Sequence, residues 1–159
     1  MKRAILASFL STCIAGQAAA LSCTPASVAA SFQAASAAEE EYVLAVGRVQ
    51  VLPGQTLPEP ADPNNRPGYS VEAQFSGRLA AEDGFTQDAV FPVTVQVDCS
   101  GPWCGGVPIG RVLAFIERRE SENVLVSSPC PVFMLTATPE FLAQAETCLA
   151  GGPCEPASQ

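Results

Sequence analysis

The segment DCSGPWCGGVPIG, residues 98–110, holds the side chains in this sequence that are best suited to chemistry. Cys99 and Cys104 stand around a Gly-Pro-Trp turn, with a Gly-Gly pair directly after them. Two such thiols can form a redox centre, share a metal ion or join in a structural disulfide. Redox pairs usually enclose two residues and precede a helix. Here four residues intervene and an apolar, strand-like run follows, so the spacing favours a disulfide framework.

The chain contains no histidine. This excludes Ser-His-Asp and Cys-His nucleophilic catalysis and every zinc site that uses histidine. A thiolate-only zinc site would need four free cysteines, in a compartment where thiols oxidise. The sequence also lacks a phosphate-binding loop, a nucleophile elbow and any metal-ligand spacing. We therefore expect a protein that is not an enzyme and that carries no metal and no cofactor.

Residues 1–20 have the pattern of a secretory signal peptide. A positive MKR start precedes an apolar stretch, and Ala18 and Ala20 form an A-x-A site with cleavage before Leu21. The stretch is short and interrupted by polar residues, so no membrane insertion is expected after cleavage. A lipoprotein signal is the weaker alternative, because the Leu that should stand three places before Cys23 is one place off. The style of the signal is bacterial, which predicts a periplasmic or secreted protein.

Cleavage leaves a single domain, residues 21–159, with six of the seven cysteines. An even number of cysteines in an oxidising compartment predicts three disulfides, and six cysteines allow 15 pairings. The mature chain has six arginines, no lysine and sixteen acidic residues, a formal net charge of −10. No basic patch can follow a phosphate backbone, so nucleic acid and anionic membrane surfaces are excluded as partners. The cysteines concerned are Cys23, Cys99, Cys104, Cys130, Cys148 and Cys154.

Two helices and five strands are expected. A first helix is predicted to begin with Thr24 as its cap and Pro25 in its first turn, and a second runs from the Thr138 cap to Gly151. Alternating apolar patterns predict the strands, and a change of phase at Gly47 suggests a bulge. Five strands that leave no open edge predict an all-β fold, a five-stranded OB-like barrel with flanking helices. The strand ranges are 41–52, 69–79, 89–99, 110–118 and 123–130.

A long loop over residues 53–68 contains five prolines and no apolar period. It is interpreted either as a plain strand connection or as a contact surface. Trp103, the only tryptophan, lies between two cysteines. Its ring either anchors a partner or packs over the neighbouring disulfide, and the second interpretation is preferred.

The order of these motifs resembles the netrin-like domain, and in particular the tissue inhibitors of metalloproteinases and their bacterial relatives. An N-terminal Cys and a helix precede VLAVGRV, a strand with F-S-G, a valine-rich strand, Cys-Gly, GRVLAFIE and V-S-S-P-C. The resemblance covers roughly Cys23 to Cys148. It implies an OB-fold barrel held together by disulfides. It also implies the pairs Cys23–Cys130, Cys99–Cys104 and Cys148–Cys154.

The chain departs from this family at its mature N-terminus. The animal inhibitors begin with Cys-x-Cys, and the amine and carbonyl of the first Cys chelate the zinc of the protease. Here Leu21 and Ser22 precede Cys23, so a chelating amine would not be tethered. The first hypothesis is therefore a netrin-like module that binds an unknown protein partner through the barrel loops and the loop over residues 53–68. The alternative is inhibition of a metalloprotease through the N-terminal edge, Leu21 to Cys23.

Overall fold

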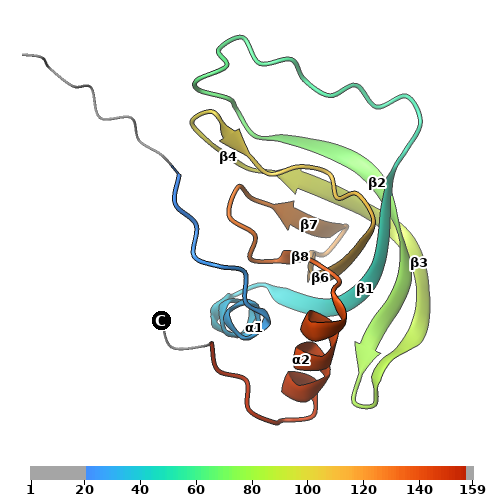
Figure 1. Ribbon diagram of the computed structural model, residues 1–159. Coiled ribbons are helices and arrows are strands. Elements are labelled where there is room, and N and C mark those ends of the chain that lie inside the picture. Colours follow the sequence, from blue (N-terminus) through green and yellow to red (C-terminus); the bar gives the residue numbers. More distant parts are fainter. Residues whose placement is uncertain (1–20, 157–159) are drawn as a thin grey trace, which may run out of the picture.

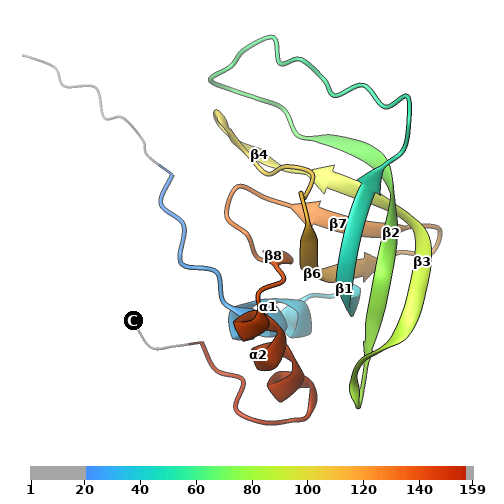
Figure 2. The same cartoon turned by 45° about the vertical axis from the view of Figure 1, so that its right-hand side comes forward.

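Five strands join edge to edge into a closed ring in the computed structural model, which describes residues 21–156 (Figures 1 and 2). The order around the ring is β1-β2-β3-β7-β6, and pairing of β1 with β6 closes it. All neighbours are antiparallel except β3 and β7. The five predicted strands are confirmed, and residues 1–20 lie outside the described part of the chain. The bounds are β1 (Glu41–Val51), β2 (Tyr69–Ala81), β3 (Gly84–Val97), β6 (Arg111–Arg118) and β7 (Asn123–Ser127).

Two helices and three short strands complete the fold. β8 pairs with β6 at the edge that β7 leaves free, and β4 pairs with β5 as a two-stranded hairpin. These three strands have two or three residues each, too few for an alternating pattern to predict them. The bounds are α1 (Val28–Ala37), β4 (Cys99–Ser100), β5 (Trp103–Cys104), β8 (Met134–Thr136) and α2 (Pro139–Leu149).

Strand β1 is buried on both of its faces. Ala45 and Val49 point into the ring, whereas Leu44 and Val46 point outward to a second apolar core beneath the helices. The bulge expected at Gly47 is wrong, because the register with β2 and with β6 runs through this residue unbroken. The apparent change of phase arises because one strand serves two cores. The irregularity lies instead in the β2–β3 ladder, where residues 79 and 80 of β2 pair with residues 87 and 85 of β3.

Gly47 has a packing role in place of a bulge. It is paired across the β1–β2 ladder with Gly77, and a Cβ on either residue would meet the backbone of the opposite strand and the ring of Phe75. The two glycines thus make room for Phe75, which is fully buried. Its ring stacks on Phe91, its partner on β3, with 5.1 Å between the ring centroids.

The two helices lie together at one end of the ring, below it in both views (Figures 1 and 2). The predicted start of the first helix at Pro25 is wrong, because α1 begins at Val28, where Ser27 is the cap and accepts from the Ala30 N–H. A serine cap satisfies the same free backbone N–H groups as a threonine, and the sequence offers both. The second helix is confirmed, with Thr138 accepting from the Phe141 N–H at 3.1 Å.

Tyr42 lies at the boundary of the core beneath the helices, where its ring stacks on Phe133 with 4.8 Å between centroids. Burial raises the pKa of its phenol, and the negative charge of Glu117 raises it further. The folded state therefore holds the Tyr42 proton more tightly than the unfolded state does. As the pH rises above about 10, the unfolded state ionises first and the free energy of unfolding falls.

We expect this alkaline loss of stability to shrink in Tyr42→Phe, because the ring stays and the titrating proton is removed. Urea denaturation at a series of pH values above neutrality measures it. Tyr69→Phe is the matched control. If Tyr42→Phe lost as much stability at alkaline pH as the wild-type chain, this role for Tyr42 would be contradicted.

Candidate interaction surface

Three disulfides form, in the three pairs that the family resemblance implies. Cys23–Cys130 joins the N-terminal segment to the loop after β7, with 5.3 Å between Cα atoms. Cys99–Cys104 closes the β4–β5 hairpin, and Cys148–Cys154 ties the last turn of α2 to the chain behind it. Three disulfides indicate an exported protein that works outside the cytoplasm. Within residues 21–156, no helix is both long enough and apolar enough to cross a membrane.

The Cys23–Cys130 disulfide joins two chain segments, and the Cys99–Cys104 disulfide closes a third segment that adjoins them. We call the surface formed by residues 21–25, 99–106 and 128–132 the disulfide face. Two hollows of about 240 Å³ each lie on it, and they share Pro131 and Val132. The first hollow is bordered by residues of the N-terminal segment and α1, the second by the end of the hairpin and the end of β7. The N-terminal edge and the hairpin are therefore parts of one continuous surface.

The long loop over residues 52–68 adjoins the disulfide face through the hairpin (Figure 1). The Arg66 N–H donates to the Gly101 carbonyl at 3.0 Å. The sulfur of Cys99 lies 3.4 Å from the Pro67 carbonyl oxygen. The loop is thus attached to the hairpin at its C-terminal end, and it leaves Leu57 54% exposed.

The residues predicted to contact a partner all lie on this face. Leu21 is 38% exposed, and Ser22 borders the first hollow. Trp103 is 47% exposed in the hairpin that Cys99–Cys104 closes, so part of its ring is accessible to a partner. Residues 128–132 form a ridge between the two hollows. Val132 on this ridge is a further exposed apolar residue that sequence reasoning missed.

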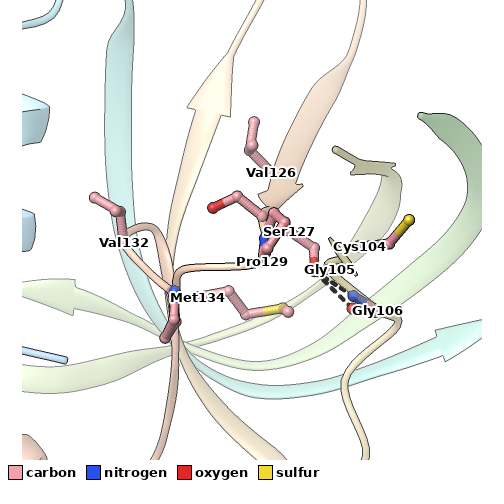
Figure 3. Close-up of a pocket in the computed structure, with 10 residues that line it drawn as sticks. Cys104, Gly105, Gly106, Val126, Ser127, Pro129, Val132 and Met134 are labelled. Atoms are coloured by element: carbon pink, nitrogen blue, oxygen red, sulfur yellow. Dashed lines mark hydrogen bonds between the residues drawn. The ribbon is translucent and has the colours of Figure 1, made fainter. Parts of the chain in front are cut away.

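Ser127 organises the second hollow, and sequence reasoning did not find it. It is buried at the end of β7, and its hydroxyl donates to the Gly106 carbonyl at 2.7 Å and accepts from the Gly106 N–H at 2.8 Å (Figure 3). Gly105 passes so close to Ser127 that a Cβ would collide with the Ser127 carbonyl. The sequence signal for this contact was the Gly-Gly pair itself, because close backbone approach demands glycine.

Two further hydroxyl groups fix the ridge between the hollows. Ser31, a buried residue of α1, donates to the Val132 carbonyl. Ser128 donates to the Cys130 carbonyl at 2.7 Å. The Cys23–Cys130 disulfide and the Ser31 bond attach residues 128–132 to the N-terminal segment and to α1, and the Ser128 bond lies within the segment. The ridge is therefore a rigid part of the surface and not a free loop.

The side chains that could bind a metal ion are dispersed over the described residues. In the part of the chain that the structure describes, no three His, Cys, Asp or Glu side chains gather where they could hold a metal ion. The one buried carboxylate among these residues, Glu117, binds Arg119, with 2.6 Å between Oε1 and Nε. This bond raises the pKa of the Arg119 guanidinium. Glu117 is thus engaged in a structural ion pair.

Removal of the Cys23–Cys130 disulfide should destabilise the fold more than removal of Cys148–Cys154. The first bond closes a loop of 107 residues and the second a loop of six. In the chain-entropy model, these loops correspond to about 5 and about 2 kcal/mol. Urea denaturation of the two double Cys→Ala variants measures the difference. Equal losses would show that the N-terminal segment contributes little to the stability of the ring.

Gly105→Ala should lower the free energy of unfolding by about 1–3 kcal/mol, because its Cβ overlaps the backbone of Ser127. Gly106→Ala is the matched control, since a Cβ there meets nothing within 4 Å. Thermal and urea denaturation of both oxidised variants check this. A Gly106→Ala variant as unstable as Gly105→Ala would contradict the close contact.

No protein-family model, curated protein or solved structure matches this chain.

Proposed function

We propose that this protein is an exported module that binds a protein partner non-enzymatically through the disulfide face. In this proposal a signal peptide is removed after Ala20, and the mature chain works in the periplasm or outside the cell. The chain's disulfides support export, and the formal charge of −10 on residues 21–159 favours a neutral or basic partner surface.

One observation carries the proposal: two disulfides fix the segments around both hollows before any partner arrives. A surface that is already ordered loses little conformational entropy when it binds. Exposed apolar side chains lie on the same face, and tryptophan is among the residue types most often responsible for binding energy. Those side chains are Leu21, Trp103 and Val132.

We further propose that the ring is an OB-type barrel of the netrin-like kind. The strand order, with one parallel pair between β3 and β7, supports this assignment. The Cys23–Cys130 bond supports it as well, because the resemblance implies that pair. The OB-type barrel hosts many unrelated functions, so the binding proposal rests on the face and not on the fold.

Site-specific photo-crosslinking in the cells that export the protein tests the binding face. A photoreactive phenylalanine analogue replaces Trp103 in one variant and Val90 in the other. Val90 is 67% exposed and lies on β3, away from the disulfide face. We expect a discrete crosslinked protein from position 103 and none from position 90. Crosslinks that form equally at both positions, or at position 90 alone, would contradict the proposal.

The geometry of the N-terminal edge favours a second candidate, inhibition of a metalloprotease. Cys130 holds Cys23 in place only two residues after the exposed Leu21. A short, anchored and exposed edge can enter a narrow protease cleft at a lower entropic cost than a free terminus.

Extension of the chain ahead of Leu21 separates the two candidates. Inhibition of a panel of zinc endopeptidases by the mature chain should fall at least about tenfold when two glycines precede Leu21, because the amine moves away from the zinc. The same two glycines added after Gln159 serve as the control. Inhibition that survives the N-terminal extension, or that is absent from the mature chain, would reject the N-terminal mechanism. Crosslinking at position 103 should be unaffected.

A further inference from the structure

The ring is incompletely closed where β7 meets β6. On one edge, β7 pairs with β3 along four residues. On its other edge it pairs with β6 only through Asn123 and Val124. From that point β6 continues with β8 as its neighbour instead. The end of β7 and the start of β8 are therefore adjacent segments with no ladder between them.

The cause is a competition for one backbone N–H. The β6–β7 register pairs Glu117 with Val124, so its continuation would place Phe115 opposite Val126. The Phe115 N–H instead donates to the Phe133 carbonyl at 2.8 Å. β8 thus takes the donor that the Val126 carbonyl would have had. The β6–β7 ladder ends at Val124, so the Val126 N–H has no ladder partner on this edge either.

The backbone of Val126 points into the resulting gap. The next residue, Ser127, accepts from the Asp98 N–H at 2.9 Å on the β3 side. Because backbone groups alternate along a strand, the N–H and C=O of Val126 face the opposite edge. Within residues 21–156, no strand pairs with that edge at Val126.

The second hollow of the disulfide face lies along this same edge. Figure 3 shows Val132 on one side of it, Gly105 and Gly106 on the other, and Met134 between them. Pro129 and Pro131 in its wall have no backbone N–H. The wall carbonyls of residues 130 and 132 already accept from serine hydroxyls. The hollow therefore offers one unpaired strand edge and an apolar wall that cannot itself complete it.

We infer that this gap receives an extended segment of the protein partner, which adds as a strand beside Val126 and places one apolar side chain against Val132 and Met134. Main-chain bonds supply affinity in this mode of recognition, and the pocket selects a side chain. The excess of acidic residues selects a neutral or basic segment and opposes a second copy of this chain. The inference rests on the proposed binding function and specifies the form of the partner.

A peptide selection tests the inference with the complete oxidised chain. A phage library of random eight-residue peptides is selected on it at about 0.15 M salt. Amide hydrogen exchange is then measured by NMR with and without a selected peptide. We expect exchange of the Val126 N–H to slow at least about tenfold, because it gains a hydrogen bond. The amides of Leu125 and Ser127, which face β3, should change less.

Two kinds of variant sharpen the test. N-methylation of the peptide residue opposite Val126 should weaken binding at least about tenfold, and N-methylation of its neighbour should weaken it less. Gly106→Leu, whose side chain has open space and borders the hollow, should also weaken binding. Val90→Leu on the outer surface of β3 is the control.

Three results would overturn the inference. These are peptides that bind without slowing exchange at Val126, a library that yields no peptide binding more tightly than about 1 mM, and a dimer of the chain that protects Val126. If crosslinking at position 103 persists alongside any of them, the binding face stands and only strand addition is rejected.

Discussion

The structure depends on β1, because this strand pairs with two neighbouring strands and its side chains enter both hydrophobic cores. Pairing with β2 along one edge and with β6 along the other closes the sheet. Its inward side chains complete the core of the ring, and its outward ones bind the helix layer. Because neither face of β1 reaches water along residues 44–47, the helices must cover it. The rest of the architecture follows from this burial.

The same closure leaves a defect where β6, the neighbour of β1, meets β7. β6 has too few free groups on one edge to pair fully with both β7 and β8, and β8 takes the position at Phe115. The chain then reinforces this weak place with the Cys23–Cys130 disulfide and the hydroxyl of Ser127. A surface that is both unpaired and rigid results. In this account, that combination makes the disulfide face a binding surface.

The sequence predicted much of this fold because its strands alternate clearly. Each of the five long strands and the helix after Thr138 was recognised from periodicity and capping residues. The change of phase at Gly47 led to a wrong prediction of a bulge. Alternation alone cannot distinguish a bulge from a strand that is buried on both faces. The helix start was misplaced by three residues because Thr24 and Ser27 are both good caps.

The candidate site was predictable only in part. Cysteine content and the resemblance identified the disulfides, and the sequence suggested Leu21, Ser22 and Trp103 as candidate contact residues. Their gathering on one face depends on long-range pairing that local patterns do not record. The role of Ser127 and the open edge at Val126 could not be inferred from sequence, because both depend on which strand reaches β6 first.

The most direct test of the central claim is a hydrogen-exchange footprint of the protein isolated with its partner from the compartment to which it is exported. The account predicts slower exchange in residues 21–25, 99–106 and 125–132 of the bound protein. It predicts no change in α2 or in the outer strand residues around Val90. Protection confined to α2 and residues 150–154, with the disulfide face unchanged, would contradict the account.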